Sequence, residues 1–290
     1  MEKLTGIYPA LITPFTAEDK LDEAAVRRVI AYNLQKGVDG FYVCGSTGES
    51  LLMSMPERKR LLEVVTDEVA GRVKVLSHIG CFHTQDAIEL ARHAATLGVS
   101  AVSSLPPFYY KFTLPELTQY YMDIVRAVDL PMIVYNAPAL TGVSFDTGNL
   151  GPIFACEQVA GIKFTSYDLY QMQRIIAAYP EKAVINGHDE IYLSGLAAGS
   201  RCAIGSTFNF MAEVFLKIRA LFLENRIEEA AIWQDKANAV IDLLINIGVF
   251  RGVKGMLNVL GLSVGECRKP FTPLTREEYA RLSEAAKIIA

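Results

Sequence analysis

The sequence lacks several features that would place it in a familiar class of protein. Its five cysteines and four histidines are scattered, with no CxxC pair and no HExxH motif, so neither a metal site nor a disulfide framework is indicated. No apolar run approaches the ~18 residues of a transmembrane helix, and residues 1–15 lack the long apolar stretch of a signal peptide. These absences predict a cytoplasmic protein with reduced thiols.

The chain also has no large excess of charge of either sign. The net charge is −4, and no basic cluster stands out along the 290 residues. Nucleic acid and anionic membranes are therefore poor candidates as partners. Apolar residues make up 51% of the chain, which fits a globular protein with a large core.

What the chain does contain is an alternation of short apolar runs and longer amphipathic segments. The runs are mostly continuous, as expected of parallel strands covered on both faces. They occupy residues 6–13, 40–45, 73–80, 100–105, 131–136, 159–164, 182–187 and 201–206. They recur about every 30 residues, the size of one βα unit. Eight such units predict an α/β fold, a (β/α)8 TIM barrel, and the first turn has no GxGxxG motif that would favour a Rossmann sheet.

The intervening segments carry helix signals. Ser54 and Glu57 have the spacing of a capping box, and Thr84 is the N-cap predicted for the following helix. Gly37 and Gly98 stand where two of these helices should end, because glycine adopts the left-handed turn that stops a helix.

The last part of the chain is helical only. Residues 228–248, 251–260 and 276–290 are predicted to form helices packed on the side of the barrel. No low-complexity linker precedes them. We therefore expect one domain over residues 1–290, with the barrel in 1–224 and C-terminal helices in 225–290.

Polar residues follow several of the predicted strands, and the active sites of such barrels form at these strand ends. GSTGE (45–49) offers two glycines and two hydroxyls that could converge on an anion, although an ordinary Gly/Ser turn would look the same. Tyr109 and Tyr110 could donate to an oxyanion or could simply pack a rigid loop.

Lys163 ends the sixth run, inside GIKFTSYDLYQ (161–171). It could extend its ammonium to the rim of the barrel. Alternatively, desolvation could make its amine neutral and nucleophilic, able to form a Schiff base with a carbonyl substrate. Tyr135 ends the preceding strand, 28 residues earlier, and is either a proton shuttle or a buried structural tyrosine.

The last two strands end in polar turns opened by Gly187 and Gly205. Asp189 and Glu190 could accept hydrogen bonds from the hydroxyls of a polyol. They could equally cap the next helix and supply negative charge to its first turn. The two roles are compatible.

Taken together, these motifs resemble the N-acetylneuraminate lyase branch of the dihydrodipicolinate synthase/N-acetylneuraminate lyase superfamily. The resemblance runs almost from end to end of the chain. It is carried by GSTGE (45–49), PFYY (107–110), YNAPALTGV (135–143), GIKFTSYDLYQ (161–171), NGHDEI (186–191), IGSTFN (204–209) and CRKPF (267–271).

The resemblance implies a role for each matching residue. Lys163 would form the Schiff base and Tyr135 would exchange protons with the substrate, while Ser46 and Thr47 would hold the keto-acid carboxylate. Tyr109 would reach the site of a neighbouring subunit in a homotetramer. The sugar-derived chain would be bound by Thr165, Gly187, Asp189, Glu190 and Ser206.

The activity implied is reversible cleavage of N-acetylneuraminate (a sialic acid) to pyruvate and N-acetylmannosamine, with no cofactor. Leu140 stands where the synthase branch has an arginine that grips a second carboxylate, so an uncharged polyhydroxylated aldehyde is favoured. The alternatives are a sister pyruvate-dependent aldolase acting on another 2-keto-3-deoxy sugar acid, and a non-catalytic barrel that binds a keto acid.

Overall fold

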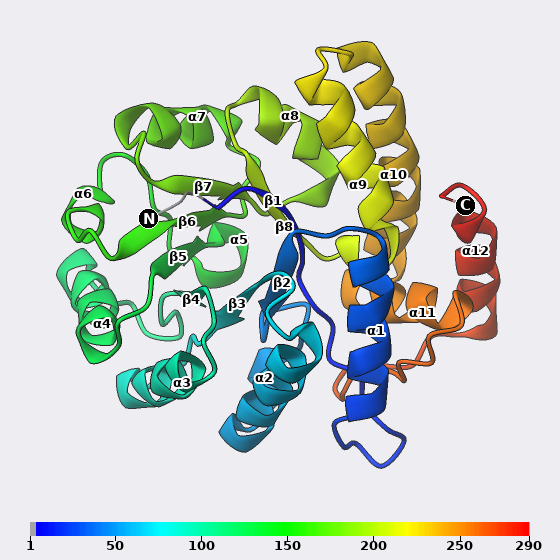
Figure 1. Cartoon of the computed structure of the whole chain (residues 1–290), viewed down its shortest axis with the longest axis horizontal. Coiled ribbons are helices and arrows are strands. Elements are labelled where there is room, and N and C mark those ends of the chain that lie inside the picture. Colours follow the sequence, from blue (N-terminus) through cyan, green and yellow to red (C-terminus); the bar gives the residue numbers. More distant parts are fainter. Residues whose placement is uncertain (1–3, 290) are drawn as a thin grey trace.

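In the computed structural model of the chain, which describes residues 4–289, a ring of parallel strands is surrounded by helices (Figure 1). Every run predicted as a strand contains one. The strands are β1 (Gly6–Pro9), β2 (Gly40–Val43), β3 (Lys74–His78), β4 (Ala101–Ser104), β5 (Met132–Asn136), β6 (Val159–Phe164), β7 (Ala183–Asn186) and β8 (Cys202–Gly205).

The sheet closes on itself. Its order is β1-β8-β7-β6-β5-β4-β3-β2, and all neighbouring pairs are parallel. A parallel bridge between Ala10 and Tyr42 joins the two ends of this order. The predicted (β/α)8 barrel is therefore confirmed.

Helices cover the outside of the ring. In the barrel they are α1 (Glu23–Gln35), α2 (Met55–Val69), α3 (Thr84–Thr96), α4 (Leu114–Ala127), α5 (Pro138–Thr141), α6 (Gly151–Phe154), α7 (Leu169–Ala178), α8 (Tyr192–Ala197) and α9 (Phe208–Leu223), with 3₁₀ turns η1 (Ser50–Leu52) and η2 (Asp189–Ile191). The unit after β5 holds only the short α5 and α6, because Pro138, Gly142, Gly148 and Pro152 prevent a long helix there.

The predicted helix signals are mostly confirmed. The capping box that begins at Ser54 is present in α2, and Gly37 and Gly98 have positive φ angles of 83° and 66°. The prediction that Thr84 is an N-cap is wrong. His83 is the N-cap of α3, since its backbone is extended while Thr84 is already helical.

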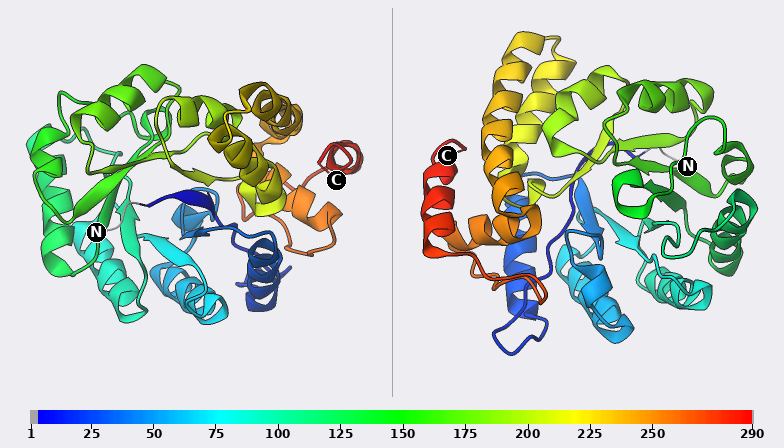
Figure 2. Two further views of the ribbon diagram at one scale, coloured as in Figure 1. Left: turned by 45° about the horizontal axis from the view of Figure 1, so that its top comes forward. Right: turned by 180° about the vertical axis from the view of Figure 1, so that it is seen from behind.

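After residue 225 the chain forms α10 (Ile227–Ile247), α11 (Val249–Val259) and α12 (Arg276–Ala286). Figures 1 and 2 show α10 beside α9, and α12 at the edge of the molecule next to α10 and α11. Within residues 4–289, no helix combines the length and apolarity needed to cross a membrane.

Two layers of core hold the barrel. One lies between the strands and the helices, and the other fills the ring itself. The interior layer includes Tyr8, Tyr42, Leu76, Ile133, Ile185, Cys202 and Ile204. Because these side chains fill the barrel, a ligand can enter only at an end of the ring.

Candidate active site

A cavity of about 380 Å³ lies at the carboxyl ends of the strands. Its polar lining contains every predicted site residue except Tyr109. These residues are Ser46, Thr47, Tyr135, Lys163, Thr165, Gly187, Asp189, Glu190 and Ser206. Residues from α10 and α11 form an apolar wall, which includes Ile241, Leu244, Ile245, Val249 and Phe250.

Lys163 lies at the bottom of this cavity and is only 4% exposed. Its Nζ is 4.2 Å from the ring centroid of Tyr135 and 4.3 Å from that of Tyr42. The register of β5 and β6 pairs Tyr135 directly with Lys163. The two residues singled out from the sequence are therefore neighbours on adjacent strands, and the ring of Tyr42 also lies against the amine.

The two phenols beside Lys163 differ in acidity. Burial alone would raise the pKa of Tyr135, but the charge of Lys163 and the hydroxyl of Ser46 outweigh burial and hold that pKa below its ordinary value. Burial raises the pKa of Tyr42 well above its ordinary value, and the charge of Tyr135 adds to this effect. Tyr135 is thus the phenol suited to exchanging a proton, while Tyr42 stays neutral and donates to Ser103 Oγ at 3.2 Å.

The turn after β2 supplies polar groups to the cavity. Thr47 Oγ1 lies 2.7 Å from Ser206 Oγ. In the part of the chain that the structure describes, the backbone N–H groups of Ser46 and Thr47 donate to no protein group. Free N–H groups beside two hydroxyls suit a carboxylate.

This turn is held in an uncommon conformation. Cys44 and Glu49, on either side of it, both have positive φ angles, 60° and 56°, which cost energy for residues other than glycine. The Glu49 carboxylate lies 2.6 Å from Lys254 Nζ, and both side chains are almost fully buried. The same carboxylate accepts from the backbone N–H of Arg268 at 2.8 Å. Helix α11 and the loop that follows it therefore fix the turn.

The turn after β7 brings Asp189 and Glu190 to the cavity. Asp189 Oδ2 accepts from both the N–H and the hydroxyl of Thr207, each at 2.7 Å, at the start of α9. The prediction that Asp189 caps the helix that follows it is wrong, because His188 is the N-cap of η2, but Asp189 and Glu190 do place negative charge in the first turn of η2. Burial raises the pKa of Asp189 to about 6. Glu190 Oε1 accepts from the hydroxyl of Tyr167 at 2.5 Å and contacts His188 Nδ1 at 3.2 Å.

Gly187 and Thr165 are in close contact. A Cβ atom at position 187 would lie 2.0 Å from Thr165 Oγ1, so only glycine fits there. The hydroxyl of Thr165 is buried and makes no hydrogen bond of good geometry among the described residues, although it lies close enough to Tyr135 to help lower the pKa of that phenol and a buried polar atom normally has a partner. A ligand group in the cavity could supply that partner.

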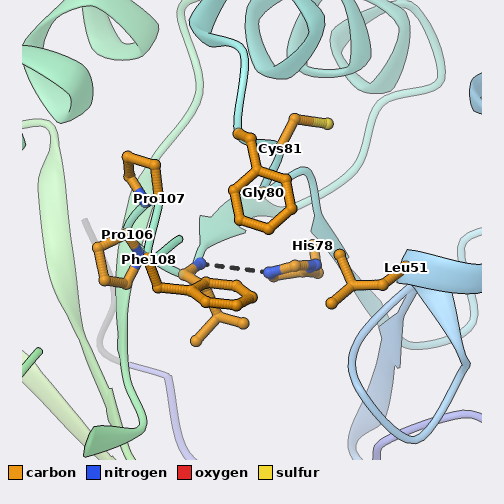
Figure 3. A pocket seen from close by; sticks show the side chains of 9 residues that line it. Leu51, His78, Gly80, Cys81, Pro106, Pro107 and Phe108 are labelled. Atoms are coloured by element: carbon orange, nitrogen blue, oxygen red, sulfur yellow. Dashed lines mark hydrogen bonds between the residues drawn. The ribbon is translucent and has the colours of Figure 1, made fainter. Parts of the chain in front are cut away.

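Tyr109 is not brought to the cavity of its own chain. It is 76% exposed and packs edge-on against Phe82 and Tyr110. A much smaller cavity of about 10 Å³ lies near it, and Figure 3 shows the His78 ring beside Phe108 in this cavity. His78 accepts from the N–H of Leu105, and burial lowers its pKa to about 3, so it is neutral.

Sequence reasoning missed three residues that shape the site: Tyr42, Tyr167 and Lys254. Tyr42 lies in a continuous apolar strand, where nothing distinguishes a core tyrosine from one that contacts a lysine. Tyr167 follows Lys163 closely and offered a signal, since an aromatic residue in a strand-end loop of a barrel is a candidate for substrate contact. Lys254 offered a weaker one, a lysine within an apolar helix face.

The fold and the cavity together define the class of protein: a (β/α)8 barrel with a buried lysine and tyrosine at its carboxyl end, an arrangement suited to Schiff-base chemistry. The chain belongs to the dihydrodipicolinate synthetase family, whose model matches residues 3–289.

Individual relatives are similar over almost their whole length. The N-acetylneuraminate lyase of Escherichia coli (strain K12 / DH10B) is 42% identical over 98% of this chain and 96% of its own. CdNal from Clostridium difficile, solved in complex with mannosamine, has a TM-score of 0.97 and 35% identity over 100% of both chains. The catalytic lysine mutant of the Ruminococcus gnavus sialic acid aldolase has a TM-score of 0.96 and 31% identity, over 100% of this chain and 97% of its own.

Proposed function

We propose that the chain is a class I aldolase that reversibly cleaves N-acetylneuraminate to pyruvate and N-acetylmannosamine. The observation that carries the proposal is the buried Lys163 amine beside Tyr135 at the bottom of the cavity. The relatives support the substrate, since proteins 41–42% identical to this chain are named N-acetylneuraminate lyases.

The reaction begins with the amine. Neutral Lys163 Nζ attacks the C2 ketone of the open-chain substrate, and loss of water from the carbinolamine leaves an iminium. Tyr135, as phenolate, takes the C4 hydroxyl proton by way of the substrate carboxylate. The C4–O electrons form the aldehyde, the C3–C4 bond breaks, and its electron pair moves to the iminium nitrogen to give an enamine.

The second half restores the enzyme. Tyr135, now a phenol, returns its proton to C3 of the enamine, which gives the pyruvate iminium, and water then hydrolyses the iminium to release pyruvate and the free amine. Because the iminium is the electron sink, this chemistry requires neither a metal nor an organic cofactor. Ser46 and Thr47 would hold the carboxylate and so fix the orientation of the iminium.

The lining of the cavity favours an uncharged aldehyde. Lys163 is the only lysine or arginine that lines it within residues 4–289, and Leu140 lines it at the position of the synthase-branch arginine. An aldehyde with a second carboxylate would meet Asp189 and Glu190 without a basic partner. Hydroxyl groups could instead donate to these carboxylates and to Ser206.

We also propose that copies of the chain assemble into the homotetramer that the family resemblance implies. The exposed aromatic cluster of Phe82, Tyr109, Tyr110 and Phe112 supports this, because so much apolar surface favours a protein partner. Tyr109 would then act at the site of a neighbour. Sedimentation velocity tests the assembly, and a stable monomer would remove that role. A cytoplasmic location stays a prediction, supported by five free cysteines.

Borohydride trapping with pyruvate tests the Schiff base. We expect reduction to leave a pyruvate-derived adduct on the Lys163 peptide and none in Lys163→Ala, which should also lack turnover. Lys182 and Lys254 are internal controls, since both are buried lysines outside the cavity. An adduct on either control, or no adduct, would contradict the mechanism. Pyruvate release from a panel of keto-deoxy acids separates N-acetylneuraminate cleavage from that of a sister aldolase.

A further inference from the structure

The outer end of the cavity is formed by an aromatic pair. Tyr167, in the loop after β6, stacks on His188, in the turn after β7, with centroids 4.3 Å apart and an interplanar angle of 11°. Both residues line the cavity. Tyr167 is 63% exposed, whereas Lys163 is 4% exposed, so the pair lies at the mouth and the amine at the bottom.

The hydroxyl of Tyr167 is hydrogen-bonded to Glu190. It donates to Glu190 Oε1 at 2.5 Å, and His188 Nδ1 lies 3.2 Å from the same oxygen. Burial would raise the pKa of Glu190, but His188 and Tyr167 together hold it at about 2, so the carboxylate is ionised at neutral pH. The pair thus keeps a hydrogen-bond acceptor fixed at the mouth of the site.

The backbone under Glu190 is fixed as well. Asn238 Nδ2 donates to the carbonyl of Glu190 at 3.1 Å, and Gln234 Nε2 donates to the carbonyl of Asp189 at 3.1 Å. Both donors belong to α10. Since the main chain is held by α10, the Glu190 carboxylate has one remaining freedom, the rotation of its side chain, and the contact with Tyr167 restricts it.

We propose that Tyr167, acting through Glu190 and stacked on His188, is a specificity residue for the hydroxylated end of the aldehyde that lies farthest from the bond being cleaved. This inference rests on the proposed function and deepens it. The substrate carbons that react must lie at Lys163, so a long chain extends towards the mouth and its last hydroxyls meet Glu190. Tyr167 sets the position in which that carboxylate receives them.

A merely structural tyrosine would behave differently. Its loss would loosen the loop after β6 and would disturb Lys163, which belongs to the same strand-loop segment. The reaction with every substrate, including pyruvate, would then be weakened to the same extent. A residue that positions Glu190 should affect only substrates long enough to reach the mouth. Pyruvate, which has no aldehyde portion, is therefore the internal reference.

Tyr167→Phe is the informative variant, because it keeps the stacked ring and removes only the hydroxyl. The matched control variant is Tyr179→Phe, at the C-terminal end of α7, which deletes a hydroxyl outside the cavity. The probes are N-acetylneuraminate, an analogue that lacks its terminal glycerol tail, and pyruvate. Cleavage gives kcat/KM for the first two, and borohydride trapping gives the half-saturating concentration of pyruvate.

We expect Tyr167→Phe to reduce the preference for N-acetylneuraminate over the truncated analogue about tenfold, the effect of one hydrogen bond to a charged group. The half-saturating concentration of pyruvate should be the same in Tyr167→Phe as in the unmodified chain. Tyr179→Phe should leave both that concentration and the substrate preference unchanged. An unchanged preference, or an equal loss on all three probes, would overturn the inference while leaving the proposed function intact. Failure of pyruvate trapping in the unmodified chain would instead refute the proposed function.

Discussion

Replacing Lys254 with methionine tests how far the C-terminal helices support the site. The substitution keeps the length and apolar volume of the side chain but removes the ammonium that lies 2.6 Å from Glu49 Oε1. Glu49 would then be a fully buried carboxylate that keeps the N–H of Arg268 and the thiol of Cys267 as partners but has no positive charge against it from Lys254. Breaking a buried pair in this way costs about 3–5 kcal/mol.

Urea unfolding measures this loss as a free energy of unfolding. Thermal unfolding gives a second measure of the same loss. Each kcal/mol corresponds to about 2–4 °C in Tm, so we expect the melting temperature to fall by roughly 6–20 °C. Lys287→Met is the control, because its pair with Glu284 is 70% and 74% exposed at the two side chains. An exposed pair contributes about 0–1 kcal/mol.

A double variant separates the missing charge from the missing packing. In Glu49→Gln/Lys254→Met neither member of the pair carries a charge, so much of the loss should be recovered, and the coupling between the two sites should be evident in the thermodynamic cycle. Lys254→Met should also raise the half-saturating concentration of pyruvate. Lys254 anchors the turn through Glu49, and the same turn carries Ser46 and Thr47. A loss no greater than that of Lys287→Met would refute the reasoning.

Two further predictions concern groups inside the cavity. Tyr135→Phe should lower kcat by roughly 10²–10⁴-fold, the range for one positioned acid–base group, while leaving the Lys163 adduct with pyruvate detectable; an unchanged kcat would contradict the assigned proton transfer. Because burial raises the pKa of Asp189 from 3.8 to about 6, folding favours its protonated form, so the stability it contributes is fully present below pH 4 and is lost as the pH rises through 6. Unfolding by urea between pH 4 and 7 should show this decline relative to Asp189→Asn, and parallel pH profiles for the two proteins would argue against it.

Local patterns in the sequence were sufficient to predict the barrel and the two residues at the bottom of its cavity. Continuous apolar runs identify strands covered on both faces, and the recurrence of the runs sets their order. Lys163 and Tyr135 could be associated because each ends a run, and in a parallel barrel consecutive runs are neighbours. The cap of α3 was missed because an acceptable N-cap side chain one residue late is indistinguishable in sequence from one in place.

The remaining parts of the site depend on contacts that no local pattern records. Lys254 and Glu49 are separated by 205 residues, and neither has a neighbour in the sequence that points to the other. Tyr167 and His188 stack only because β6 and β7 are adjacent and their loops bend towards each other. Such pairs are decided by tertiary packing, which overrides the local preference of each residue.

These contacts change how the helices after residue 225 should be understood. Apolar residues of α10 and α11 form one wall of the cavity. Gln234 and Asn238 of α10 hold the turn that carries Asp189 and Glu190, while Lys254 of α11 holds the turn that carries Ser46 and Thr47. The extension thus contacts both the side proposed for the carboxylate and the side proposed for the aldehyde. We infer that the barrel without it would keep the amine of Lys163 but lose the fixed geometry of both binding turns.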